Sequence, residues 1–144
     1  VLLTFDKKHL MNKGKARQLY EDLKKSGIKW LSLRYHKRPP LISTIFDILC
    51  GFVACLIIAV KERPRLVHAR SYVSSVIALA LKKILRLKFI FDMRGFWADE
   101  RVEGKLWTKK ASLYYFAKIL EKYFLKNADE IIVLTEQAKR IIKS

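Results

Sequence analysis

The chain has 144 residues, of which 51% are hydrophobic, with 5 Gly and 3 Pro, and this composition excludes disordered, collagen-like and disulfide-stapled miniature proteins. Its 30 Lys and Arg residues outnumber 13 Asp and Glu residues, which gives a formal net charge of +17. We therefore expect an anionic partner, for which nucleic acid, an anionic membrane face and a phosphorylated ligand are equally suitable.

The first third of the sequence predicts a strand, a helix and a second strand. Val1–Phe5 is a short apolar run typical of a strand. The helical spacing that follows is set by Ala16, Leu19, Tyr20 and Leu23. Gly27 is expected to end this helix. Ile28–Tyr35 predicts the second strand, and Pro39 and Pro40 prevent a helix from running through them.

The run Leu41–Val60 is apolar, contains Asp47 as its one charged residue and has basic residues on both sides. Its length would allow it to cross a bilayer. It also falls where a crossover helix must connect two strands, and Asp47 disfavours a span. We expect a buried or membrane-grazing crossover helix, with a membrane-spanning helix as the alternative. Cys50 and Cys55 would point to different faces of this helix and are expected to be reduced, buried thiols.

The rest of the chain continues the alternation of strands and helices. The expected elements are a strand at Leu66–Ala69, a helix at Tyr72–Leu85, strands at Lys88–Met93 and Ile131–Leu134, a helix at Ala111–Lys126, and another helix from Glu136 onward. Such alternation, with short and nearly continuous apolar strands, predicts an α/β fold with a parallel sheet covered by helices on both faces. Ligands bind at the carboxyl ends of the strands in this architecture.

The densest cluster of polar groups at a strand end is the segment Asp92–Arg101. Here Gly95 would allow a backbone to approach a ligand closely, and Arg94 could bind a carboxylate or phosphate in a bidentate manner. The alternative is an ordinary loop in which Asp92 caps, Arg94 pairs with Glu100 and two aromatic side chains fill a gap.

Four segments in order resemble the N-terminal domain of GT-B glycosyltransferases of family four, the group 1 transferases. They are Leu66–Arg70, Phe89–Glu100, Glu121–Asp129, which ends in Asn127-Ala128-Asp129, and Ile131–Glu136. The resemblance implies one Rossmann-like, three-layer α/β/α domain over residues 1–144, with a mostly parallel sheet. It also implies the acceptor-side half of a two-domain enzyme whose donor-binding C-terminal domain is absent here. The chain starts without Met, and we expect it to be a catalytically incomplete piece of a longer protein.

The implied reaction moves a sugar from a nucleotide-sugar, as co-substrate, to a lipid-linked or saccharide acceptor. The candidates for contacts with the acceptor or the donor phosphates are Arg70, Asp92, Arg94, Gly95, Glu100, Thr135 and Glu136. Arg70 stands where the family often has a second His. The loop after the first strand reads Phe5–Lys8, where many relatives have a pair of glycines. Fixed cations and backbone N–H groups in a dry cleft would stabilise a departing nucleoside diphosphate.

No metal, other cofactor or identifiable catalytic residue is expected. The sequence has no Asp-x-Asp triplet that could hold a metal against a diphosphate. His9 and His36 have no partner at ligand spacing, and His68 lies inside an apolar strand, where a satisfied core or cleft histidine is expected. No motif places a nucleophilic triad.

The basic residues outside this cluster predict a surface for an anionic bilayer or a lipid-phosphate acceptor. They are Lys7, Lys8, Lys13, Lys15, Arg17, Lys82, Lys83 and Arg86. We expect a protein peripheral to the cytoplasmic face of the cell membrane; a solvated positive face is the simpler alternative. A different hypothesis is a non-catalytic basic module that binds nucleic acid through Trp30, Arg34, Tyr35 and Lys37. The sequence lacks helix-turn-helix, zinc-finger and RNP-type signatures, which disfavours this module.

Overall fold

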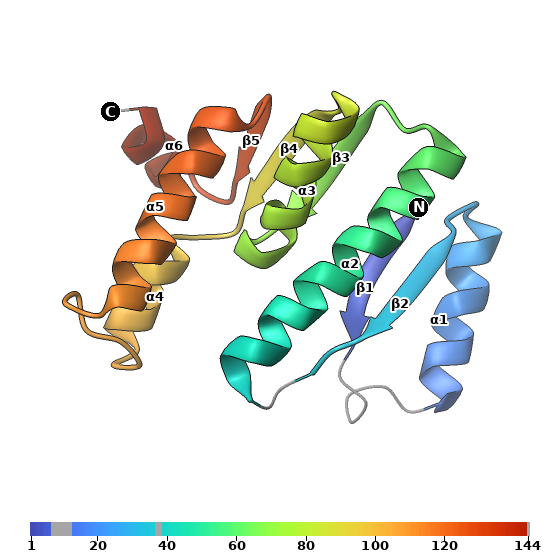
Figure 1. Cartoon of the computed structure of the whole chain (residues 1–144), viewed down its shortest axis with the longest axis horizontal. Coiled ribbons are helices and arrows are strands. Elements are labelled where there is room, and N and C mark those ends of the chain that lie inside the picture. Colours follow the sequence, from blue (N-terminus) through green and yellow to red (C-terminus); the bar gives the residue numbers. More distant parts are fainter. Residues whose placement is uncertain (7–12, 37–38, 144) are drawn as a thin grey trace. The chain divides into compact units, whose positions relative to one another are not determined.

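The computed structural model describes residues 1–6, 13–36 and 39–143, without the side chains of Lys13, Pro40 and Leu41. The chain forms two compact units, the N-terminal unit Val1–Cys55 and the C-terminal unit Leu56–Ser144. Strands and helices alternate along it (Figure 1). They are β1 (Leu2–Asp6), α1 (Lys13–Lys25), β2 (Trp30–Arg34), α2 (Pro40–Glu62), β3 (Leu66–Arg70), α3 (Tyr72–Leu85), β4 (Lys88–Met93), α4 (Trp97–Glu103), α5 (Ser112–Asn127), β5 (Glu130–Val133) and α6 (Glu136–Lys143).

The N-terminal unit contains a parallel pair of strands, β1 and β2, in which Leu2 lies opposite Trp30. The Trp30 Nε1–H group donates a hydrogen bond of 2.9 Å to Thr4 Oγ1 across the pair. The helix α1 contacts β2 and ends where the sequence predicts, because Gly27 adopts a left-handed conformation with φ of 72°.

The helix α2 begins at Pro40, which a first helical turn accommodates because no amide hydrogen is needed there. Asp47 on α2 is 4% exposed and accepts hydrogen bonds from the His36 backbone N–H at 2.8 Å and from Nδ1 at 2.6 Å. Both cysteines are free, as predicted, but neither is fully buried, since Cys50 is exposed and Cys55 is half-buried. Cys50 lies next in sequence to Leu49, whose side chain is 57% exposed.

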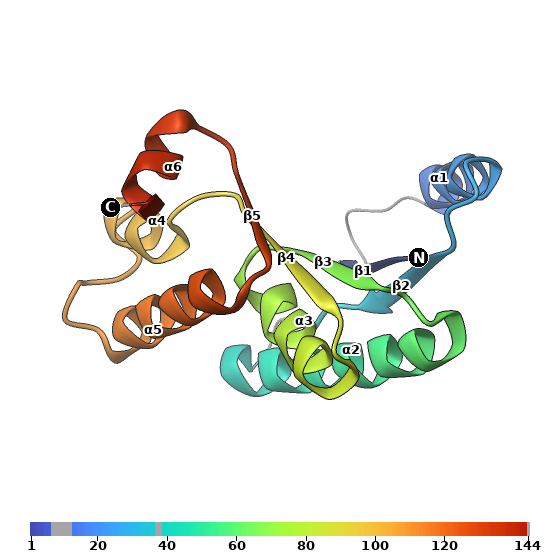
Figure 2. The same ribbon diagram turned by 90° about the horizontal axis from the view of Figure 1, so that it is seen from above.

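The C-terminal unit is built on the parallel sheet β3-β4-β5, with β4 in the centre. Alternation along β4 points Phe89, Phe91 and Met93 to one face, where they are at most 2% exposed. Figure 2 shows α3 and α5 together on one side of this sheet, and Phe124 of α5 joins the same buried cluster. This face is the core of the unit.

The predicted Rossmann-like α/β class is confirmed, with parallel strands that alternate with helices in two sheets. The boundaries of α3 and β4 agree with the sequence analysis residue for residue. The helix α4 was not predicted, since its residues were assigned to a loop. No side chain caps this helix, and the sequence features that favour it are two acidic residues in its first turn, Asp99 and Glu100, which interact well with the helix dipole.

Candidate functional site

The carboxyl ends of β3 and β4 bring together a small cluster of charged side chains. Arg70 lies opposite Asp92 in the strand register, on the face away from the aromatic core. The Asp92 carboxylate lies 3.6 Å from Arg70 Nε and 3.5 Å from His68 Nε2. Asp92 is 14% exposed, whereas His68 is 48% and Arg70 is 60% exposed. The apolar strand predicts a core or cleft histidine for His68, and the structure excludes the core, because the strand turns this side chain to the exposed face.

The turn from β3 to α3 holds this edge in a rare conformation. Ser71 has φ of 73°, a left-handed value that non-glycine residues seldom adopt. Its backbone N–H donates to the Asp92 carbonyl oxygen at 3.0 Å, and its own carbonyl oxygen accepts the Ser75 hydroxyl at 2.7 Å. These bonds fix the position of Arg70 relative to Asp92 at the neighbouring strand end.

The segment after β4 presents Arg94 as an exposed cation. Its side chain has no hydrogen bond, ion pair or ring contact with any residue that the structure describes. The loop alternative predicts an ion pair between Arg94 and Glu100, and the described residues do not show this pair. Glu100 instead lies against Gly95, where an added Cβ would stand 2.1 Å from Glu100 Oε1. The space that the missing Cβ of Gly95 leaves is therefore occupied by the Glu100 side chain. The expectation was that a ligand would approach the backbone there.

A partly buried hydrogen-bond network next to this segment ties three helices together. Asp99 of α4 accepts hydrogen bonds from Tyr114 and Lys118 of α5, both at 2.9 Å. Lys118 also donates to Glu121 at 2.5 Å. Glu121 is 3% exposed and accepts a second bond from the Tyr72 hydroxyl at the start of α3. The network therefore fixes α4, and with it the segment that bears Arg94.

The network also changes the pKa values of its members. Burial alone would raise the pKa of Asp99, but the hydrogen bonds from Lys118 and Tyr114 outweigh it and lower this pKa. Burial, followed by the bond to Glu121, raises the pKa of Tyr72 well above its ordinary value. Burial by itself would lower the pKa of Lys118, yet its bonds to Glu121 and Asp99 raise it. Each shift favours the protonation state that the hydrogen bonds require.

Thr135 and Glu136 stand at the start of α6, after β5. The Thr135 Oγ1 atom accepts a hydrogen bond from the Ala138 backbone N–H at 3.1 Å, so this side chain caps the helix. Glu136 is 77% exposed and lies 3.3 Å from Lys139 Nζ. Both candidates are used locally, in the first turn of a helix.

The predicted basic surface divides between the two units. Lys7 and Lys8 lie outside the described residues, as does the side chain of Lys13, while Lys15 and Arg17 are exposed on α1. In the C-terminal unit, Lys82 bonds to Asp129 at 2.7 Å, Lys83 contacts Tyr123, and Arg86 is the left-handed residue that ends α3. Lys82 and Lys83 therefore have structural partners in addition to solvent.

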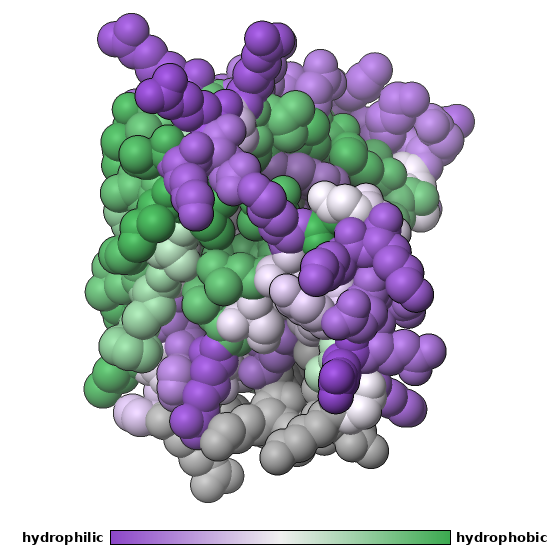
Figure 3. All heavy atoms as spheres, turned by 90° about the vertical axis from the view of Figure 1, so that its right-hand side faces the viewer, coloured by the Kyte–Doolittle hydropathy of each residue, from purple (hydrophilic) through white to green (hydrophobic). Residues whose placement is uncertain are grey.

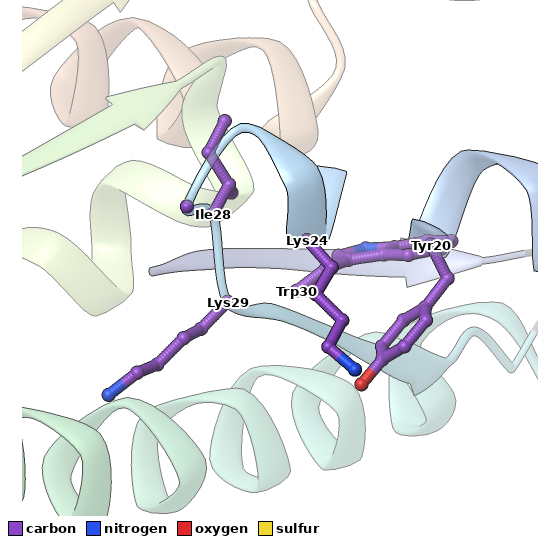
Figure 4. Close-up of a pocket in the computed structure, with 6 residues that line it drawn as sticks. Tyr20, Lys24, Ile28, Lys29 and Trp30 are labelled. Carbon is purple, nitrogen blue, oxygen red and sulfur yellow. The ribbon is translucent and has the colours of Figure 1, made fainter. Parts of the chain in front are cut away.

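A shallow hollow in the N-terminal unit was not predicted. It has a volume of about 330 Å³ and is lined by Tyr20, Lys24, Gly27, Ile28, Lys29 and Trp30. Figure 4 shows Lys24 and Tyr20 projecting to the same side, with Lys29 directed away from them. The hollow lies at the amino end of β2, whereas ligands of parallel α/β sheets bind at the carboxyl ends.

Two further sequence hypotheses concern nucleic acid and metal. Trp30, the aromatic residue that a nucleic-acid module would use for stacking, is half-buried and bonded to Thr4. Within the part of the chain that the structure describes, no group of three His, Cys, Asp or Glu side chains could hold a metal ion.

The comparison with protein families covers both units. The family model described as "Glycosyl transferase 4-like domain" matches residues 14–143, which is nearly the whole chain. A search of curated proteins found no match. The match includes the strand ends that bear Arg70, Asp92 and Arg94, and it agrees with the resemblance seen in the sequence. The chain belongs to the glycosyl transferase 4-like domain family, as an N-terminal domain of the GT-B glycosyltransferase type.

Proposed function

We propose that this domain is the acceptor-binding half of an enzyme that transfers a sugar from a nucleotide-sugar to a lipid-linked or saccharide acceptor at the cytoplasmic face of the membrane. Family membership gives the glycosyltransferase type of function. The net charge of +17 favours acceptors and donors that bear phosphate. The nucleotide of the donor would be held by a second domain.

The observation that supports this site most directly is the state of Arg94. It is an exposed cation without a partner among the described residues, at the carboxyl end of the central strand. An arginine binds two oxygens of a phosphate with its planar guanidinium group. We therefore assign Arg94 to a phosphate of the acceptor or the donor.

The neighbouring groups complete an electropositive edge. Asp92 is held between His68 and Arg70, which leaves the Arg94 charge without a carboxylate to neutralise it. When the bond between the sugar and the nucleoside diphosphate breaks, negative charge develops on the departing phosphate. The Arg94 cation at this edge would stabilise that charge in the transition state.

The proposal is tested with Arg94→Ala in the intact protein that contains this domain. Uridine- and guanosine-diphosphate sugars serve as donors, with polyprenyl phosphate and short saccharides as acceptors, and release of nucleoside diphosphate is measured. We expect kcat/KM to fall by roughly 10²-fold or more, because one charged donor to a developing anion contributes about that factor.

Lys88→Ala is the matched control, since it removes a cation from the opposite end of the same strand. This variant should keep its activity within a small factor, and circular dichroism should show both variants folded. Wild-type turnover by Arg94→Ala, or equal losses in both variants, would contradict the assignment of Arg94.

A further inference from the structure

The long helix α2 exposes many of its large apolar side chains, while several of its small and polar residues are buried. Seven large apolar residues with exposures of 52–67% recur every three or four positions, which places them on one face: Ile42, Ile45, Phe46, Leu49, Val53, Ile57 and Val60. We call this face the α2 stripe. Ser43, Asp47 and Gly51 lie on the opposite face and are buried. A helix that faced water would have the reverse pattern.

Figure 3 shows hydrophobic side chains gathered along the left edge of the view. The α2 stripe is aliphatic apart from Phe46 and contains no Tyr, Trp, Arg or Met. Protein–protein interfaces are enriched in Tyr, Trp, Phe, Met and Arg, of which the stripe contains Phe46 alone, whereas Leu and Val are under-represented among the residues that dominate binding energy. The composition of the stripe therefore favours hydrocarbon over a protein partner.

The dimensions and flanking charges of α2 also fit a lipid surface. From Ile42 to Val60 the stripe extends about 27 Å, at about 1.5 Å per helical residue. Directly after it come Lys61, Arg63 and Arg65, which are exposed cations suited to anionic headgroups. By length and composition alone, α2 could cross a membrane, with a mean hydropathy of 2.4 over its apolar part.

Two observations favour a helix that lies on the membrane over one that crosses it. Asp47 is buried and bonded to His36, so the polar face of α2 is held by protein. The family match runs through the whole of α2, from residue 14 to 143, as expected for a helix inside one family domain. We infer that α2 lies in the surface of an anionic bilayer, with the α2 stripe inserted into the acyl boundary.

Vesicle flotation of the full chain tests this inference. We expect flotation with vesicles of phosphatidylcholine and phosphatidylglycerol, and weaker flotation with phosphatidylcholine alone. The double variant Leu49→Glu/Val53→Glu should bind about tenfold or more weakly, because it removes buried apolar area. The uncharged variant Leu49→Ser/Val53→Ser should also bind weakly, whereas Leu19→Glu on α1 should float like the wild type.

Cys50 provides a native probe of the same surface. It is exposed on α2, whereas burial raises the pKa of the Cys55 thiol and so reduces its reactivity. A membrane-impermeant maleimide should label Cys50 in solution and label it more slowly when vesicles are present. Alkaline carbonate should release the bound wild-type protein, as expected for a helix that does not cross the bilayer.

Several outcomes would overturn the inference. Three of them come from the vesicle experiments: equal flotation of the wild type and both double variants, unchanged Cys50 labelling, or retention of the wild type in carbonate. The fourth is a wild-type protein that does not bind vesicles but forms a dimer in light scattering, with the dimer lost in Leu49→Ser/Val53→Ser. The inference adds a membrane-contacting element to the proposed function. Failure of the membrane inference is distinguishable from failure of the proposed function, because vesicle binding needs no sugar transfer. Arg94→Ala should therefore float like the wild type even where it loses activity.

Discussion

The two units share an alternation of parallel strands and helices but differ in what they bury. In the C-terminal unit, Phe89, Phe91 and Phe124 are completely buried. In the described part of the N-terminal unit no large hydrophobic side chain is buried, and Leu19 and Leu31 are 44% and 38% exposed. The same sequence pattern therefore predicts the elements in both units, while a core forms only where aromatic residues meet between a sheet and two helices.

The largest expected difference between the units comes from truncation of hydrophobic residues. Phe91→Ala should lower the free energy of unfolding by about 3–5 kcal/mol, because it leaves a cavity under α3 and α5. Leu31→Ala in β2 should cost less than about 1 kcal/mol, since much of that side chain is already in contact with water. Urea unfolding of both variants measures the difference, and equal losses would mean that the units do not differ in this way.

The next comparison uses the buried carboxylates, Glu121 in the C-terminal unit and Asp47 in the N-terminal unit. Glu121→Gln should cost about 2 kcal/mol, because the bonds from Tyr72 and Lys118 lose their charged acceptor. Asp47→Asn should cost about 1 kcal/mol, because an amide oxygen still accepts the His36 backbone N–H. Thermal unfolding of both variants tests this order, and a larger loss in Asp47→Asn would reverse the comparison.

These residues also show what the sequence could and could not predict. Strands and helices follow from periodicity, and the cluster of Asp92 and Arg94 follows from its place at a strand end. The bond between Tyr72 and Glu121 joins residues 49 positions apart, and no local pattern indicates it. The sequence left open whether the apolar face of α2 is buried or grazes a membrane, because periodicity identifies an apolar face without showing whether that face meets the core, water or lipid.

A smaller effect is the response of the C-terminal unit to acid. Hydrogen bonds from Lys82 and from the Phe89 backbone N–H lower the pKa of Asp129. A carboxyl group with a lowered folded pKa stabilises the fold above its unfolded pKa, and this stabilisation is lost as the pH falls through the folded value. Asp129→Asn should therefore reduce stability at neutral pH and match the wild type in strong acid.

Fluorine NMR of protein labelled with fluorotryptophan can locate this acid response. Trp30 reports on the N-terminal unit, whereas Trp97 and Trp107 report on the C-terminal unit. In the wild type, the signals of Trp97 and Trp107 should show the loss of stability as the pH falls, and Asp129→Asn should weaken that dependence. An unchanged pH dependence in the variant would mean that Asp129 does not couple acid to the stability of this unit.

The smallest effects are expected where helices end. After α1, Gly27 has φ of 72° and its N–H donates to the Lys24 carbonyl oxygen, while the Ile28 N–H donates to the Leu23 carbonyl oxygen. These two bonds form a Schellman motif, which glycine fits without strain. After α3, the same left-handed conformation is adopted by Arg86, with φ of 55°. The two units thus end comparable helices with different residues in one conformation.

Exchange of these residue types should change stability in opposite directions. Gly27→Ala should cost about 1 kcal/mol, because a Cβ disfavours the left-handed conformation. Arg86→Gly should stabilise the C-terminal unit by up to about 1 kcal/mol, reduced by the greater freedom of glycine in the unfolded chain. Urea unfolding resolved by the tryptophan signals of each unit measures both changes. If Arg86→Gly destabilises the unit, the Arg86 side chain makes a contribution larger than the strain of its backbone, and the end of α3 depends on that side chain as well as on its conformation.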